Sequence, residues 1–538
     1  MTGLTPVVLR RHRGVSRADG TRSASWPAVV VAVLAGVVLA AQLLVPPGTG
    51  LADNGDYGRV LRVLDINGPE VIQDRSVGPR SAYLTLQFHH DPLFASDDTD
   101  PVYRSSQLPL LTAAEAVTGL TGSAAVLDLR VLALIGAVLL ALCLGLLVHS
   151  VPGGPRTRLV AGCGLILLLC DSAVAVYLAS LLSEPASVIG AVLFSAICLR
   201  ALRQPSLSGP AVIALGLGSV PLLLAKTQNA PLVAVVAVLL ALTVLSKAAG
   251  VWQRVTAAAM ASVLVAMSAA FVLEQPVELS VTNRYNTVFY GLLAVSPQPE
   301  ADLEALGLDP RLARWAGTSY FANPKALEDP LMAGQPYDVG FSEIIRFYLG
   351  HPERAVAMAS KGAVAAFEVR PRVGDRAMTP AVPQDRPPTV RPPGERPGEY
   401  VANYPPGEGR APYTLSHRFS LASSVAQAIA PLGPALLPLT ALWATGVAVR
   451  LLRRRRSCPD AALGRTILVL VSMAVLQFAV TLVGDGLYEL PKHLFTFDVL
   501  CALIVTLASV ATWRLMRGRR RLQPTLDASS PPLPVAAT

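Results

Sequence analysis

Residues 26–45 read WPAVVVAVLAGVVLAAQLLV, an apolar run without a single charge. About 20 residues of α-helix measure roughly 30 Å, which matches the hydrocarbon thickness of a bilayer. Arginines crowd the preceding residues 10–22, and Pro46-Pro47-Gly48 follows without a small-residue cleavage site. We therefore predict an uncleaved first transmembrane helix whose N-terminal flank lies in the cytoplasm.

The composition of the whole chain also indicates a membrane protein. Of 538 residues, 52% are hydrophobic and 15% are charged, a balance typical of polytopic membrane proteins. The formal charge of +9 does not indicate nucleic-acid binding, because the basic residues form short clusters between apolar segments, as in cytoplasmic loops. Signatures of nucleic-acid-binding folds are missing from the sequence. We predict an all-α polytopic protein that contacts membrane lipid and no nucleic acid.

Further apolar segments extend this pattern to ten predicted transmembrane helices. With both termini in the cytoplasm, ten helices place every dense arginine cluster on one side of the membrane, which an odd number would not do. The segments after the first are residues 124–148, 159–181, 184–200, 209–225, 230–246, 255–273, 419–449, 466–483 and 494–513.

This topology divides the chain into five parts. They are a cytoplasmic tail (1–25), helices one to seven with a catalytic outer loop at 46–124 (26–273), an extracytoplasmic region (274–418), helices eight to ten (419–513) and a disordered cytoplasmic tail (514–538). Within the extracytoplasmic region, short helical patterns cover 299–315 and 341–367, with a break at Leu349-Gly350-His351-Pro352. Residues 371–412 are rich in proline and arginine, which predicts an extended linker.

The outer loop begins with Asp53-Asn54-Gly55-Asp56-Tyr57-Gly58-Arg59, a few residues beyond the first helix. Its glycines allow tight turns and close approach to a ligand, and Asp56 and Arg59 would share a face if the chain is helical there. Our hypothesis is that Asp56 is a catalytic base on the extracytoplasmic side, with Asp53 as the reserve candidate. The alternative is that either aspartate caps an outer helix.

Ionisable residues elsewhere also fall on the outer side, close to predicted helix ends. Such groups cost roughly 2.5–3.5 kcal/mol each at the centre of a span and less toward its ends, so their gathering on one face suggests a site. Besides the aspartates of the motif, the set comprises Asp171, Glu184, Lys226, Asp485, Glu489, Lys492 and His493.

Glycosyl transfer from a lipid phosphate suits this mixture of acids and bases. A carboxylate, Asp56, would take the proton of the acceptor hydroxyl. Cations would hold the departing phosphate, and the candidates are Arg59, Lys226, Lys492 and His493. A single displacement would invert the anomeric configuration, and the absence of a nucleotide-binding glycine motif agrees with a lipid-linked donor. The remaining candidates would support the acceptor: Asp171, Glu184, Asp485, Glu489, Tyr285 and Tyr290.

Each of these assignments has a structural alternative. Lys226 would snorkel to the interface, whereas Lys492 and His493 would belong to an ordinary polar turn. Solvated helix ends or turns would explain Asp171, Glu184, Asp485 and Glu489. The two tyrosines, which lie in the segment 285–291, either stack on sugar rings or anchor at the membrane interface.

Three motifs resemble a known family. Asn54-Gly55-Asp56-Tyr57-Gly58-Arg59, Tyr285-Asn286-Thr287-Val288-Phe289-Tyr290-Gly291 and Leu306-Gly307-Leu308-Asp309 are similar to bacterial surface-glycan hexose transferases of the S-layer type. These enzymes belong to the GT-C superfamily of polyprenyl-phosphate-sugar-dependent membrane glycosyltransferases. The resemblance implies a GT-C-like fold, a first-loop carboxylate at Asp56, a polyprenyl-phosphate-linked sugar donor and a glycan or lipid acceptor. The proline-rich insert at 371–412 has no counterpart in it.

Metal sites and rival functions complete the expectations. The six cysteines lie in or near apolar spans or after an arginine run and match no metal motif, so we predict no metal and no cofactor. A divalent cation at His89-His90-Asp91 is the alternative. The rival function is a transporter or flippase of a lipid-linked glycan, which would place ionisable groups at the bilayer midplane with repeat symmetry. A non-catalytic scaffold would leave the acids and bases without a role.

Overall fold

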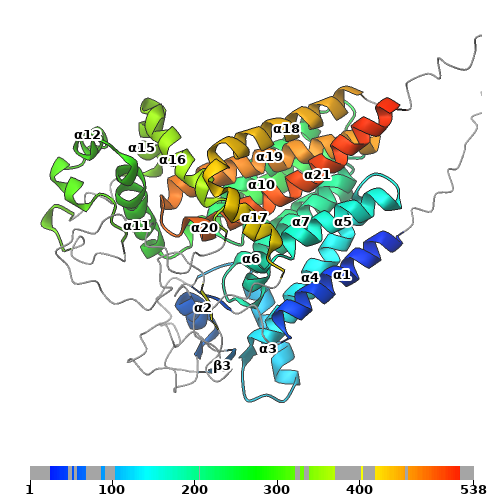
Figure 1. Ribbon diagram of the computed structural model, residues 1–538, viewed down its shortest axis with the longest axis horizontal. Coiled ribbons are helices and arrows are strands. Elements are labelled where there is room, and N and C mark those ends of the chain that lie inside the picture. Colours follow the sequence, from blue (N-terminus) through cyan, green and yellow to red (C-terminus); the bar gives the residue numbers. More distant parts are fainter. Residues whose placement is uncertain are drawn as a thin grey trace, which may run out of the picture.

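The structure is a computed structural model that describes residues 25–45, 51–53, 57–67, 86–90, 103–204, 206–320, 328–332, 339–369, 401–403, 419–454 and 458–520. Its long helices lie side by side in one bundle (Figure 1). Eight helices in these ranges are long and apolar enough to cross a membrane, which confirms the predicted polytopic helical fold. They are α1 (Trp26–Leu43), α4 (Leu129–Ser150), α7 (Glu184–Ala201), η5 with α9 (Thr227–Leu245), α10 (Val251–Leu273), α17 with α18 (Leu421–Arg454), α19 (Cys458–Asp485) and α21 (Phe495–Arg520).

The other two predicted spans are helical but differ from a straight crossing. The third consists of α5 (Pro155–Leu169), followed after a bend of 61° by α6 (Ser172–Ala175) and η4 (Val176–Ala179). The fifth is α8 (Gly209–Leu223), whose 15 residues give about 22 Å of helix. By length and composition, the described residues contain eight helices that could cross a membrane, or nine with the bent pair, where the sequence predicts ten.

Helix α7 lies in the middle of the bundle. Within it 83% of the residues are buried, against 22% in α10, because α7 is apolar on all sides and packs on α4, α8, α19 and α21. A Cβ atom at Gly190 would lie 2.5 Å from the backbone nitrogen of Leu222. Glycine therefore lets the backbones of α7 and α8 touch, which holds the start of α7 close to the loop after α8.

The outer region packs against one end of the bundle and has a small core of its own (Figure 1). The rings of Tyr285 and Phe289 stack in this core at 4.8 Å between centroids. The predicted helical patterns at 299–315 and 341–367 are helical, and the second is broken at His351 as expected. The elements are α11 (Val277–Tyr285), the π-helix η6 (Asn286–Leu292), η7 (Leu293–Val295), α12 (Pro299–Ala305), η8 (Pro310–Trp315), η9 (Pro330–Met332), α15 (Phe341–Gly350) and α16 (Pro352–Ala365).

Short strands join the outer loop to distant segments. Strand β1 (Leu51–Asp53) pairs antiparallel with β5 (Val401–Asn403), so the predicted linker at 371–412 contains a strand, while its residues 371–400 and 404–412 lie outside the described residues. A second sheet has the order β2-β3-β4. The remaining elements of the outer loop are α2 (Tyr57–Leu64), β2 (Ile66–Asn67), β3 (Gln87–His90), α3 (Leu108–Leu120) and β4 (Leu127–Asp128).

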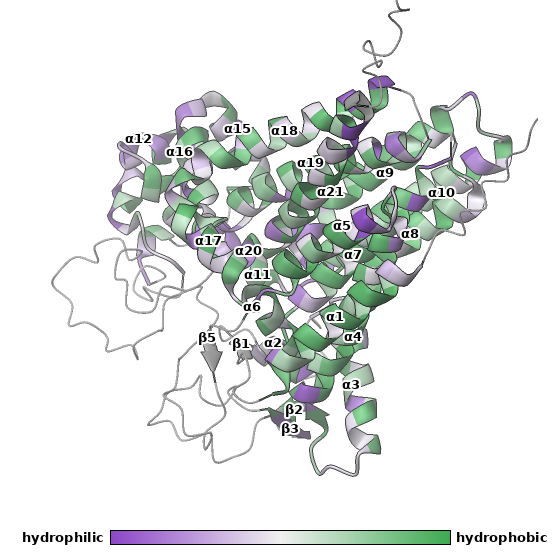
Figure 2. Ribbon diagram, turned by 45° about the vertical axis from the view of Figure 1, so that its right-hand side comes forward, coloured by the Kyte–Doolittle hydropathy of each residue, from purple (hydrophilic) through white to green (hydrophobic). Residues whose placement is uncertain are grey.

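The two ends of the bundle differ in polarity. Figure 2 shows apolar residues along the bundle and polar residues in the outer region and at the helix ends. The start of α1 and the end of α21 lie together at the end opposite the outer region (Figure 1). Arginines gather there: Arg514 is 2.6 Å from Asp460, and Arg465 donates to the carbonyl of Leu202 at 3.1 Å. Helix α21 continues to Arg520, past the predicted start of the tail at residue 514.

Candidate active site

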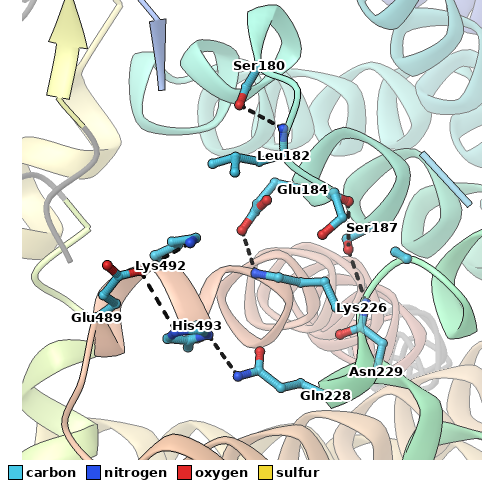
Figure 3. Close-up of polar contacts among 12 residues, drawn as sticks. Ser180, Leu182, Glu184, Ser187, Lys226, Gln228, Asn229, Glu489, Lys492 and His493 are labelled. Carbon is cyan, nitrogen blue, oxygen red and sulfur yellow. Dashed lines mark hydrogen bonds and ion pairs between the residues drawn. The ribbon is translucent and has the colours of Figure 1, made fainter. Parts of the chain in front are cut away.

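Six of the ionisable residues predicted for the outer face meet at one end of the bundle. Figure 3 shows five of them, namely Glu184, Lys226, Glu489, Lys492 and His493. They come from three segments, namely the start of α7, the start of η5 (Thr227–Leu232) and the connection from α19 through α20 (Leu490–His493). A glutamine joins them. We call the set the charge cluster; its members are Glu184, Lys226, Gln228, Asp485, Glu489, Lys492 and His493.

The first half of the cluster is an ion pair between Glu184 and Lys226. Their Oε1 and Nζ atoms are 2.5 Å apart, and the glutamate side chain is fully buried. Glu184 is the first residue of α7 and Pro185 is the second. Proline suits a helix start because it has no N–H group to leave unpaired. The amide of Asn229 donates to Ser187 and to the Leu222 carbonyl, both at 3.0 Å, and so fixes the turn that carries Lys226.

The second half of the cluster lies in the turn after α19. Lys492 Nζ is 3.1 Å from Glu489 Oε2, and both side chains are buried. His493 Nδ1 is 3.2 Å from Asp485 Oδ2. The turn is compact because Gly486 has φ +62° and Glu489 has φ +46°, the left-handed region that costs a residue with a side chain roughly 1–2 kcal/mol.

Gln228 joins the two halves. Its Nε2 atom donates to Asp485 Oδ2 and lies 2.8 Å from His493 Nδ1. The carboxylate accepts only, so the amide nitrogen rather than the amide oxygen must face it. The side chain of Gln228 therefore has one possible orientation in the cluster, with its oxygen directed away from Asp485.

Two buried acceptors of the cluster have no hydrogen-bond partner in the described chain. They are Oε2 of Glu184 and Oε1 of Gln228. Leaving a buried acceptor unpaired costs about 1–3 kcal/mol, and both belong to residues in contact with, or two positions from, Lys226. A ligand with donor groups would satisfy them.

Burial of so many ionisable groups calls for a functional reason. The cluster holds three carboxylates, two ammonium groups and one imidazole. Well-packed apolar residues often stabilise a protein as well as a buried ion pair does, so stability alone does not explain the cluster. Groups of this kind near a membrane more often mark a substrate or ion site.

The outer loop reaches the same place. The hydroxyl of Tyr57, the first residue of α2, donates to Ser180 Oγ at 3.1 Å, and Ser180 lies just before Glu184 in the chain. Arg59 lies over the ring of Tyr103, 5.5 Å from its centroid. Asp53 ends β1. Asp56 lies outside the described residues, directly before buried Tyr57.

Comparison with known proteins identifies the family. The family model described as the YfdI N-terminal transmembrane domain matches residues 16–378 and 396–525. The chain belongs to this family. The match covers the charge cluster and the three quoted motifs, and confirms the resemblance that those motifs indicate. It leaves out residues 379–395 of the proline-rich insert.

Similarity to individual proteins is weaker than the match to the family. No curated protein matches the sequence. Among solved structures, the chain is similar to the archaeal oligosaccharyltransferase AglB from Archaeoglobus fulgidus, which was solved in complex with an inhibitory peptide and a dolichol-phosphate. The TM-score is 0.37 and the identity 16%, and the alignment covers 94% of this chain and 52% of that one. The chain thus spans about half the length of AglB.

Other residues predicted for the site of this YfdI-domain chain have different surroundings. The carboxylate of Asp171 accepts hydrogen bonds from the backbone of Ala173 at 3.0 Å and of Ser423 at 3.1 Å. It caps α6 and docks α17 on the bend after α5. Both bonds are structural, as in other N-capping aspartates.

Of the two predicted tyrosines, Tyr285 directly precedes the π-helix η6 and Tyr290 lies within it, and η6 contacts α19. Tyr285 is buried, and its hydroxyl is 2.9 Å from Thr318 Oγ1. Tyr290 lies edge-on to Tyr488, with 6.3 Å between ring centroids, next to the turn of the cluster. The π-helix reaches this turn because Gly486 and Gly291 are in contact: a Cβ on Gly486 would be 2.6 Å from the Asn286 carbonyl.

Ion pairs hold the outer region together. Arg354 Nε is 2.8 Å from Asp302 Oδ2, and both side chains are nearly buried. Asp329 accepts from the guanidinium of Arg314 and, at 2.6 Å, from the indole of Trp315. The bond to Arg314, ahead of the other contacts, lowers the pKa of the Asp329 carboxyl below its usual value.

The alternative metal site is partly described. His89 and His90 belong to β3, and His89 Nδ1 is 3.2 Å from the Ala124 carbonyl. Asp91 lies outside the described residues. Among the described residues, no group of three or more histidine, cysteine or acidic residues is arranged to hold a metal ion, and the six cysteines are unpaired.

Sequence reasoning missed two contributors. Gln228 follows Lys226 in the polar stretch Lys226-Thr227-Gln228-Asn229, and four polar residues in succession between apolar segments were the available signal. Tyr57 belongs to the first-loop motif, but its contact with Ser180 is made between segments far apart in the sequence. The sequence held no signal for this hydrogen bond.

Proposed function

We propose that the chain is a membrane glycosyltransferase. It moves a sugar from a polyprenyl-phosphate donor to a glycan or lipid acceptor of the cell envelope, on the extracytoplasmic face of the plasma membrane, with inversion and with Asp56 as the general base. The charge cluster is the observation that carries this proposal. Membership of the YfdI-domain family supports it through the resemblance of the motifs.

Cations in the cluster suit the leaving phosphate. Lys226 and Lys492 are each held by a carboxylate, at 2.5 and 3.1 Å, so their ammonium groups are in place before a ligand arrives. Fixed positive charge in a largely buried site stabilises charge that develops on a leaving oxygen. His493 provides a third donor, because its imidazole carries at least one N–H group in either protonation state. Arg59 stands further along the outer loop, over Tyr103.

The unpaired acceptors suit a sugar. Glu184 Oε2 and Gln228 Oε1 are buried without a donor, and a hexose or pentose offers several hydroxyl donors. Asp485 and Glu489 orient the histidine and the lysine, so they support the site through their neighbours. We assign Glu184 and Gln228 to sugar binding and Asp485 and Glu489 to positioning. Asp171, Tyr285 and Tyr290 would support the acceptor path indirectly, as parts of the surrounding framework.

The base must approach the cluster from the outer loop. Asp56 immediately precedes Tyr57, whose hydroxyl is bonded to the segment before α7. Of the two acids of the motif, Asp56 is adjacent to this anchored tyrosine in the sequence, whereas Asp53 is four residues away from it. This supports Asp56 over Asp53, which is already placed in β1.

A complementation experiment tests the proposal. A deletion strain carrying the Asp56→Asn variant should insert the protein normally but lack the surface sugar, because the amide cannot take a proton. Asp53→Asn is the matched control and should restore the sugar. Full activity of Asp56→Asn removes the base assignment. Accumulation of a complete lipid-linked glycan in the deletion strain would indicate the flippase instead.

The phosphate assignment has its own test. Lys226→Gln and Lys492→Gln should raise the KM for the lipid-linked donor more than that for the acceptor. Lys361→Gln, which changes an exposed residue of α16, should alter neither KM. Equal effects on donor and acceptor would indicate a general structural role for these lysines.

A further inference from the structure

A groove lies at the end of the protein opposite the charge cluster. It has a volume of about 410 Å³ and runs between α18 (Gly433–Arg454) and α21. Arginines gather at this end of the bundle, which the positive-inside rule assigns to the cytoplasm. The groove is remote from the candidate active site, and the proposed function does not use it.

The walls of the groove are apolar toward the middle of the bundle. Leu442 and Trp443 are exposed large side chains on α18, and Met516 is one on α21. Gly446 lies between them, and a Cβ placed there would meet nothing within 4 Å. The missing side chain therefore leaves open space over α18 at this position.

The other end of the groove is basic. Arg450 and Arg454 line it, one helical turn apart, so they share a face of α18. Arg454 uses one nitrogen, Nη1, in a bond of 3.3 Å to the Leu515 carbonyl. The residues that line the groove include no acid, and the carboxylate of Asp460 nearby is already bonded to Arg514 at 2.6 Å.

We propose that this groove binds one anionic phospholipid of the cytoplasmic leaflet. The headgroup phosphate would lie between the guanidinium groups of Arg450 and Arg454, whose planar donors match phosphate oxygens. An acyl chain would lie along Leu442, Trp443 and the space over Gly446. Basic pockets between membrane helices on this side recognise anionic headgroups, and the adjoining apolar walls favour a lipid over free phosphate.

Native mass spectrometry of the full-length protein tests this proposal. The protein would be reconstituted in nanodiscs of phosphatidylglycerol and phosphatidylcholine, extracted and weighed with its retained lipids. Wild type should retain one phosphatidylglycerol. Arg450→Gln/Arg454→Gln should bind it roughly 30-fold more weakly, since each basic residue contributes about a factor of five near an anionic surface. Inorganic phosphate should not compete.

Two further variants separate the groove from general charge. Arg453→Gln/Arg517→Gln removes the same charge at the same end from residues outside the groove and should leave retention unchanged. Gly446→Leu fills the groove without altering charge and should reduce retention as the arginine pair does. Equal losses in both arginine pairs, full retention in Gly446→Leu, equal retention of phosphatidylcholine or displacement by phosphate would each overturn the proposal.

Discussion

Removal of the cation from the Glu184–Lys226 pair should strongly destabilise the protein. In Lys226→Met the glutamate keeps its position at the start of α7, where its side chain is 0% exposed, while the lysine it loses is 13% exposed. Unit charges about 4 Å apart attract by about 4 kcal/mol at an effective dielectric constant near 20. Breaking a buried pair on one side costs about 3–5 kcal/mol, and we expect a loss in that range.

The second variant of this experiment restores the balance. Glu184→Gln/Lys226→Met removes both charges, so its loss should be well below that of Lys226→Met alone, because no unpaired ion is buried. The free energy of unfolding would be measured by tryptophan fluorescence during denaturation in mixed micelles, with Lys361→Met as the exposed control, expected within about 0.5 kcal/mol of wild type. If Lys226→Met behaves like Lys361→Met, the pair is not buried as described and our reasoning about the cluster fails.

Three more outcomes follow from single contacts. Gly486→Ala should lower the thermal midpoint, because an alanine in the left-handed conformation costs about 1–2 kcal/mol and its Cβ would clash with the backbone. Gly484→Ala, which has open space around it, should not lower it. Equal midpoints would contradict the docking of the π-helix on this turn. Tyr57→Phe should cost about 0.5–1.5 kcal/mol of unfolding free energy by removing the bond to Ser180, and an unchanged value would count against that bond. Because the pKa of Asp329 is lowered in the folded protein, its ionised carboxylate stabilises the fold fully above about pH 4, and this stabilisation is lost as the pH falls through the folded-state pKa. In Asp329→Asn, thermal midpoints measured across a pH series should therefore fall less on the acid side. A fall equal to that of wild type would refute this.

Much of the bundle could be predicted from the sequence because apolar length is a direct physical requirement for crossing a bilayer. That Glu184, Lys226 and Lys492 would lie at the same end of the bundle also followed, since the alternation of spans leaves only two ends. Helix α8 was predicted too long because apolar residues continue past its end: Leu224 ends the helix, and the chain at Lys226 is extended.

Partners within the site could not be predicted in the same way. Which carboxylate pairs with Lys226 depends on how closely α7 and α8 approach, and this is set by Gly190 against the backbone of α8. Asp171 lies at a helix end like the members of the cluster, yet its oxygens are used by backbone N–H groups. An acid that caps a helix and an acid that joins the cluster give the same sequence pattern, so only the packing of the helices distinguishes them. The strand at residues 401–403 likewise had no periodicity to reveal it.

The order in which the cluster is synthesised has a consequence for membrane insertion. Glu184 and Lys226 leave the ribosome within 42 residues of each other, and Glu489 and Lys492 within three. At about 5–20 residues per second, the second pair follows the first by roughly 15–60 s. A chain that stops between residues 226 and 485 therefore already carries both partners of the first pair, but it has no complete cluster.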